Sequence, residues 1–134
     1  MNFLRSIVSI LSAPLLYGMI CVPTLGILYS QLPHLVNEQG GSRHVPLLLG
    51  TEFIQFLALV LCGYVTARLA PRREWLHTVI AIILMLTVAV NVQLSFWDAV
   101  PFWHHFVFFA SIVVGMSLGA RLRLRGVEPA PVSS

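Results

Sequence analysis

Four long apolar stretches constrain the fold of this chain more than any other feature. They cover residues 3–29, 46–69, 75–97 and 101–120. A helix that crosses the hydrocarbon core of a membrane needs about 20 apolar residues, and each stretch has that length. The pattern predicts an all-α integral membrane four-helix bundle in residues 1–125, built as two antiparallel hairpins. The polar residues 126–134 are expected to form a disordered cytoplasmic tail.

The composition agrees with lipid as the solvent for these stretches. Of the 134 residues, 57% are hydrophobic and only 10% are charged. Soluble domains carry about 25% charged residues, so this chain has too little polar surface to cover itself in water. The first stretch is interpreted as a retained helix rather than a cleaved signal peptide, because it stays apolar beyond Val22 and lacks a small-residue cleavage site.

Arginine positions predict the orientation of the four spans. Seven of the eight arginines fall at the start of the first span, at the end of the second or in the connection after it, or after the fourth, and only Arg43 falls in a loop on the other side. Short cytoplasmic loops are enriched in Arg, so both termini are expected in the cytoplasm of a multi-pass inner-membrane protein. The topology determinants, besides Arg5, are Arg68, Arg72, Arg73, Arg121, Arg123 and Arg125.

Small residues predict where helices meet. Ser111, Gly115 and Gly119 share one face of the fourth span, and Gly63 belongs to a polar and small-residue sector of the second. Such residues let helix backbones approach closely in lipid. The interpretation is packing within the bundle, with a homo-oligomer interface as the alternative.

One group of polar residues is expected to converge inside the membrane. Glu52 and Gln55 occupy the inward sector of the second span, Asn91 lies in the third and His104 in the fourth. Counted at about 1.5 Å per residue, Glu52, Asn91 and His104 fall at one level in the outer half of the bundle. By contrast, His105 is expected to be solvated at the interface.

Two roles are open for this constellation. A carboxylate in a membrane span is costly, so Glu52 needs a partner or a purpose. One role is a site that binds a proton or a small cation with His104. The other is a hydrogen-bonded clasp, from Glu52 to Asn91 or His104, that fixes how the helices pack.

The sequence contains no motif for catalysis, metal binding or nucleic-acid binding. There is no Ser-centred elbow, HExxH, Gly-rich phosphate loop or pair of catalytic carboxylates, so no enzyme activity is expected. The histidines show no recurring ligand spacing, and neither a metal nor a cofactor is expected. The arginines form no basic stripe with interleaved aromatics, which argues against nucleic acid as a partner.

The segment from Gly63 to Arg73, followed by Trp75, Leu76 and His77, resembles small uncharacterised four-helix proteins of bacterial inner membranes. The resemblance implies that location and carries no known site. Small multidrug transporters also have four helices and a membrane carboxylate, but theirs lies in the first span. The expected function is a non-enzymatic packing, assembly or regulatory subunit that acts through helix–helix contacts with another membrane protein or with itself. The alternative is a small transporter or channel component that uses Glu52.

Overall fold

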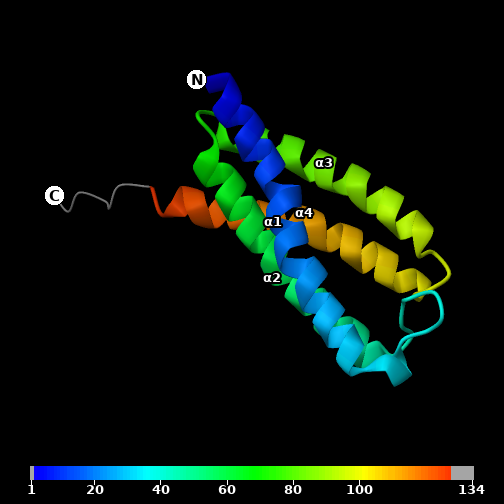
Figure 1. Ribbon diagram of the computed structural model, residues 1–134. Helices are drawn as coiled ribbons and strands as arrows, with labels where there is room; N and C mark the ends of the chain where they lie inside the picture. Colours follow the sequence, from blue (N-terminus) through cyan, green and yellow to red (C-terminus); the bar gives the residue numbers. More distant parts are fainter. Residues whose placement is uncertain (1, 128–134) are drawn as a thin grey trace.

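The computed structural model describes residues 2–127, and within them the chain is all-α with no strand. The predicted all-α fold of four long helices is confirmed (Figure 1). Their ends lie within two residues of the predicted ones, except that the last helix continues five residues beyond residue 120. The predicted tail lies outside the described residues apart from a turn at 126–127. The elements are α1 (Asn2–Gln31), the short 3-10 helix η1 (Pro33–Leu35), α2 (Val45–Leu69), α3 (Glu74–Ser95) and α4 (Phe102–Arg125).

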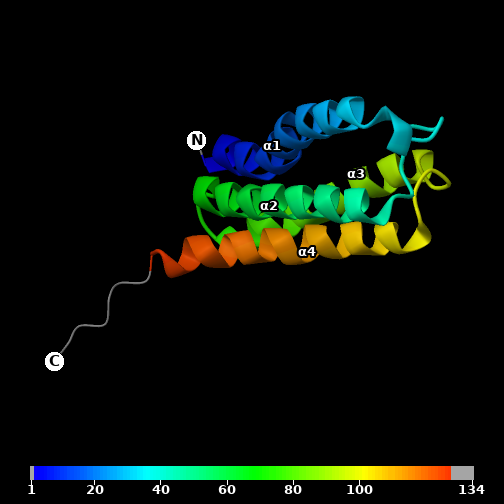
Figure 2. The same ribbon diagram turned by 90° about the horizontal axis from the view of Figure 1, so that it is seen from below.

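Consecutive helices run in opposite directions, so the bundle has two distinct ends (Figure 2). The start of α1, the connection between α2 and α3, and the end of α4 lie together at one end, which we call the arginine end. It carries the six arginines singled out from the sequence, together with Arg5. We call the opposite end the loop end, and it consists of η1, the segment 36–44 and the connection between α3 and α4. Arg43 lies there and donates to the carbonyl oxygen of Asp98 at 3.1 Å.

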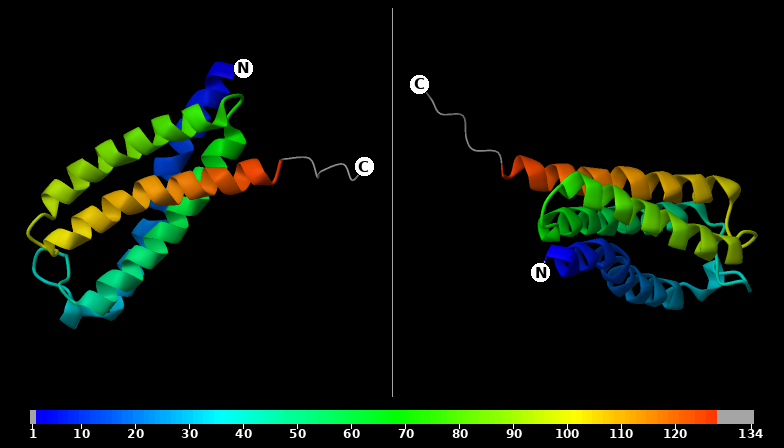
Figure 3. Two further views of the ribbon diagram at one scale, coloured as in Figure 1. Left: turned by 180° about the vertical axis from the view of Figure 1, so that it is seen from behind. Right: turned by 90° about the horizontal axis from the view of Figure 1, so that it is seen from above.

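The most extensive contact joins α2 and α4, which are not neighbours in sequence (Figure 3). A Cβ built on Gly119 would collide with the carbonyl oxygen of Val60 and lie 2.7 Å from the backbone nitrogen of Tyr64. A Cβ on Gly63 would likewise strike the backbone of Met116. Glycine is needed at both positions because the two helix backbones touch there.

The other two packing residues lie along the same interface. A Cβ on Gly115 would approach the Cβ of Leu59 to 3.0 Å. Ser111, one turn earlier in α4, is half-buried. The face formed by these residues therefore packs on α2 of the same chain.

Helix α1 forms hydrogen bonds with α2 and α3 near its start. The Ser9 hydroxyl donates to the carbonyl oxygen of Thr66 at 2.7 Å, and Ser6 Oγ lies 3.0 Å from His77 Nε2. Pro14 and Pro23 lie inside α1. Each proline removes one backbone hydrogen bond and pushes on the preceding turn. The second half of α1 bends away from α2 (Figure 2).

The loop end is closed by contacts around Asn37. Its side-chain oxygen accepts hydrogen bonds from the backbone nitrogens of Gln39 and Gly41. Its side-chain nitrogen donates to the carbonyl oxygen of Ala99 at 2.8 Å. A Cβ on Gly41 would lie 2.7 Å from the Cβ of Ala99, so this glycine permits the close approach. The segment between α1 and α2 thus covers the connection between α3 and α4.

The outer surface of the bundle is apolar over all four helices. Phe53, Leu94 and Phe102 are 63 to 64% exposed, and many other large apolar side chains are similarly open. A soluble monomer rarely exposes a contiguous apolar surface of this extent. All four helices are also long and apolar enough to cross a membrane. These two properties indicate a multi-pass membrane protein.

Candidate functional site

Glu52 and His104 form a buried pair across the interface between α2 and α4. Glu52 lies in the second turn of α2 and His104 in the first turn of α4. His104 Nε2 is 3.0 Å from Glu52 Oε1, and both side chains are less than 10% exposed. The structure therefore brings together two of the four residues that the sequence had placed in one constellation.

The pair is close but poorly hydrogen-bonded. Within residues 2–127, neither carboxylate oxygen of Glu52 and neither ring nitrogen of His104 has a hydrogen-bond partner of good geometry. The short distance between the two side chains is therefore an ionic contact, with His104 charged when protonated, rather than a linear hydrogen bond. Buried polar groups in proteins are nearly always hydrogen-bonded, so four such atoms in one place are unusual.

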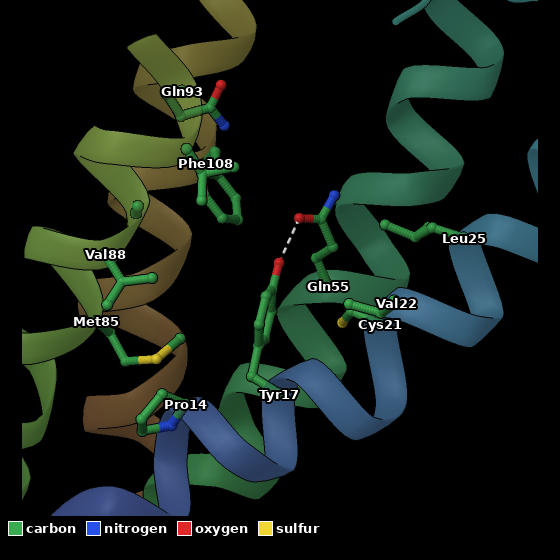
Figure 4. Close-up of a pocket in the computed structure, with 12 residues that line it drawn as sticks. Pro14, Tyr17, Cys21, Val22, Leu25, Gln55, Met85, Val88, Gln93 and Phe108 are labelled. Carbon is green, nitrogen blue, oxygen red and sulfur yellow. Dashed lines mark hydrogen bonds between the residues drawn. The ribbon is translucent and has the colours of Figure 1, made fainter. Parts of the chain in front are cut away.

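Gln55 lies one turn after Glu52 and faces α1. Its side-chain oxygen accepts a hydrogen bond from the Tyr17 hydroxyl at 2.6 Å (Figure 4). Tyr17 did not figure in the sequence-based constellation. A signal was present, because a buried tyrosine hydroxyl in an apolar span requires a polar partner from another helix.

Asn91 does not face the interior of the bundle. It is exposed, and its side-chain nitrogen donates to the carbonyl oxygen of Thr87 in its own helix at 2.8 Å. Ser95 makes the same kind of bond to Asn91. Short polar side chains can satisfy themselves on the preceding turn of a helix, so this stripe does not need to face inward. The expectation that Asn91 turns into the bundle is corrected.

Gln93 holds the inward position on α3 instead. It is buried, and its side-chain oxygen lies 2.7 Å from His105 Nδ1. His105 Nε2 lies 3.2 Å from the carbonyl oxygen of Trp97, and the two rings stack with centroids 4.4 Å apart. His105 is 1% exposed, which corrects its expected place among solvated residues. Both partners are oxygens that accept, so a neutral His105 donates to one of them, and the ring joins α4 to the end of α3.

A cavity of about 250 Å³ lies between α1 and α3, with Gln55 and Phe108 lining it from α2 and α4 (Figure 4). A second cavity of about 180 Å³ adjoins it toward the loop end. Gln55, Val92 and Gln93 line both, and the second is also lined by His104. Of the predicted constellation, Gln55 therefore lines both cavities and His104 lines the second, whereas Glu52 and Asn91 line neither.

Metal-binding groups do not gather in the described part of the chain. Within residues 2–127, no three His, Cys, Asp or Glu side chains lie close enough together to hold a metal ion. Cys21 and Cys62 are both buried and free. Cys62 Sγ contacts the carbonyl oxygen of Ala13 at 3.5 Å, which is a packing contact with α1.

Comparison of the chain with protein-family models, with curated proteins and with solved structures finds no match. Its function is therefore inferred from its own residues.

Proposed function

We propose that this chain is a non-enzymatic, four-span protein of the bacterial inner membrane with both termini in the cytoplasm. The proposal is supported by the apolar surface of the four helices and by seven arginines at the arginine end against Arg43 at the loop end. Short loops on the cytoplasmic side of a membrane are enriched in Arg and Lys. This rule favours a cytoplasmic location for the arginine end. The Glu52–His104 pair then belongs to the periplasmic half of the membrane.

In this setting the protein acts as a component of a small transporter or channel, and Glu52 with His104 binds a proton or a small cation. The observation that carries this proposal is the 3.0 Å contact between two buried ionisable side chains that lack other hydrogen-bond partners within residues 2–127. Ionisable groups inside membrane spans are rare and commonly mark ion pathways and proton relays.

The chemistry of the pair suits reversible binding. A carboxylate and an imidazole 3.0 Å apart can share one proton, or the carboxylate can take a cation when the imidazole is neutral. Because the two side chains come from α2 and α4, a change in the charge of either one alters the attraction between these helices. Binding and helix packing are therefore coupled at this site.

The test is ion flux in proteoliposomes with the Glu52→Gln variant. The substitution keeps the shape of the side chain and removes its charge, so proton- or cation-dependent flux should be lost while the helices still fold. Glu38→Gln is the matched control, because Glu38 is an exposed carboxylate at the loop end. Its flux should equal that of the unaltered chain.

Circular dichroism and size-exclusion chromatography in detergent separate the two roles of Glu52. A folded Glu52→Gln protein without flux supports the binding site. If the variant unfolds, His104→Asn provides a second test, because it leaves the carboxylate in place and removes the imidazole. Unaltered flux in a folded variant of either residue contradicts the proposal.

A second candidate is a packing, assembly or regulatory subunit that binds another membrane protein or a second copy of itself. The face formed by Gly115 and Gly119 cannot serve this role, because it is occupied by α2. In contrast, Cβ atoms built on Gly18 and Gly26 of α1 would meet nothing within 4 Å. Helix α1 is also the least buried of the four. A partner helix would therefore meet α1.

Crosslinking in native membranes tests this candidate. Cysteines placed at Gly18 or Gly26 should capture a defined neighbour, whereas a cysteine at Leu118 on the exposed side of α4 should not. A chain that stays monomeric in lipid and yields no defined crosslink from α1 would contradict it.

A further inference from the structure

The cavity between α1 and α3 has apolar walls and an open side. Its walls include Leu25 from α1, Met85 and Ala89 from α3, and Phe108 from α4. Val22 and Val88 also line it and are 73% and 45% exposed, so they form a rim on the outer surface of the bundle. A molecule dissolved in the lipid phase can therefore enter between the two helices.

Two amide groups face the inner part of this cavity. The oxygen of Gln55 accepts a hydrogen bond from the Tyr17 hydroxyl, and the oxygen of Gln93 accepts one from His105 in the tautomer that carries the proton on Nδ1. Both side chains line the main cavity and the adjoining one. With its oxygen occupied, Gln55 offers a ligand its NH₂ group, which donates hydrogen bonds, and Gln93 does the same in that tautomer of His105.

The second cavity is also lined by a polar side chain that has no hydrogen-bond partner of good geometry within residues 2–127. His104 lines the adjoining cavity, is 7% exposed, and has no hydrogen-bond partner of good geometry within residues 2–127. In its neutral form the ring carries one N–H donor and one acceptor. Apolar walls thus lead to the polar side chains of Gln55, Gln93 and His104, and no Lys or Arg lines either cavity among the described residues.

We propose that this space binds a neutral lipophilic molecule whose head group carries a carbonyl oxygen. The head accepts hydrogen bonds from the Gln55 and Gln93 amides, and the apolar tail leaves between α1 and α3 into the membrane. An apolar cavity of about 150 Å³ can hold a benzene ring. The main cavity, at about 250 Å³, has room for a substituted ring or a short length of acyl chain.

Two sources share this chemistry: a lipophilic quinone, and the ester carbonyl of a glycerolipid. The experiment uses the full chain in detergent and measures the melting temperature against the concentration of three probes. Decylubiquinone supplies ring carbonyls, monoolein supplies an ester carbonyl, and decylbenzene supplies the ring and tail without a carbonyl. A ligand that binds only the folded state raises the melting temperature in a saturable way.

We expect a saturable rise with decylubiquinone or monoolein and none with decylbenzene. The probe that binds with the lower apparent Kd identifies the source of the carbonyl. Gln55→Met keeps the length of the side chain and removes its donor. It should raise the apparent Kd about fivefold to tenfold, the loss of one or two neutral hydrogen bonds.

Two further variants test the location. Ala89→Phe fills the cavity and should abolish the rise, whereas Val90→Phe, on the exposed side of α3, should leave it unchanged. If Ala89→Phe does not fold, Val88→Trp narrows the rim from an exposed position. Equal stabilisation by decylbenzene, no response to any probe, or unchanged binding in the folded cavity-filling variant overturns the proposal. Because ion flux is not the readout, the outcome does not depend on whether Glu52 and His104 carry ions.

Discussion

The cost of burying Glu52 depends on His104, and the cost of burying His104 depends on Glu52. Both are more than nine-tenths buried, and no other group within residues 2–127 compensates their polar atoms. Removing charges from water is costly, and the attraction between two buried charges only partly offsets that cost. Loss of one member therefore leaves the other buried without compensation, whereas loss of both removes the cost as well.

A double-mutant cycle on this pair should be strongly non-additive. His104→Leu should lower the free energy of unfolding by about 3 kcal/mol, because it leaves the Glu52 carboxyl group without a partner. The double variant Glu52→Leu and His104→Leu should lose less than His104→Leu alone. The measurement is unfolding in mixed micelles with rising SDS. Additive effects would show that the two side chains do not act as a pair.

The polar residues of α3 offer a second comparison at single positions. Gln93→Leu should destabilise the fold by about 1–3 kcal/mol, because the buried His105 then lacks a partner for Nδ1. Asn91→Leu changes an exposed side chain that bonds only to its own helix, and should alter stability by no more than about 0.5 kcal/mol. The same micelle titration measures both. A larger loss of stability in Asn91→Leu than in Gln93→Leu would show that Asn91, and not Gln93, faces the interior.

At this scale the sequence predicted part of the site. Glu52 stands out because it is the carboxylate within an apolar span, and His104 follows because it shares the stripe of Gly115. The choice between Asn91 and Gln93 depends on the rotation of α3, which a pattern of self-satisfied polar residues does not reveal. His105 was misplaced because its partners, Gln93 and the Trp97 carbonyl, become neighbours only when α3 and α4 pack.

Between whole elements, the contact of α2 with α4 dominates the bundle. Its closest points are backbone to backbone, at Gly63 against Met116 and at Gly119 against Val60 and Tyr64. Helix association in lipid lacks a hydrophobic driving force and depends on such close packing. The Glu52–His104 pair lies along this same interface, so the glycines also set the distance between the two side chains.

Glycine-to-alanine substitutions should separate packed from unpacked positions. Gly119→Ala forces a methyl group against backbone atoms that cannot rotate away, and should cost about 3 kcal/mol of unfolding free energy or more. Gly26→Ala meets open space and should raise stability by up to about 1 kcal/mol through helix propensity. SDS titration in mixed micelles measures both changes. Equal effects would contradict the assigned interface.

The four helices were predictable because each apolar stretch has the length of one helix. Which helices contact each other was harder to predict from the sequence. Short connections predicted hairpins of sequence neighbours, and consecutive helices do run antiparallel, yet the main contact joins α2 with α4. The glycine stripe of α4 indicated that a close neighbour exists, but several helices could have provided it. The extension of α4 to Arg125 also escaped prediction, because the polar end of a helix has no apolar signal.

For the molecule as a whole, orientation is the property on which the proposed function depends. The arginine end and the loop end are chemically distinct, and the proposed periplasmic site lies nearer the loop end. Gln39 at the loop end and Val127 beyond α4 are both exposed, so each can report on one side of the membrane.

Cysteine labelling of intact bacterial cells tests this orientation. Gln39→Cys should react with a membrane-impermeant maleimide in intact cells, whereas Val127→Cys should react only after the cells are lysed. The unaltered chain is the control, because Cys21 and Cys62 are buried. Labelling of Val127→Cys in intact cells would reverse the orientation and move the Glu52–His104 pair to the cytoplasmic half.

The hydrogen bond from Asn37 to the carbonyl oxygen of Ala99 has a consequence for biogenesis. Asn37 leaves the ribosome 62 residues ahead of Ala99, and chains are built from the N-terminus. While α1 and α2 enter the membrane, the α3–α4 connection that the segment 36–44 contacts has not yet been inserted. The segment's closure must wait until α3 and α4 have been inserted. The segment 36–44 therefore reaches its place only after the α3–α4 connection has formed, and a nascent chain halted after α2 lacks the surface that this segment covers.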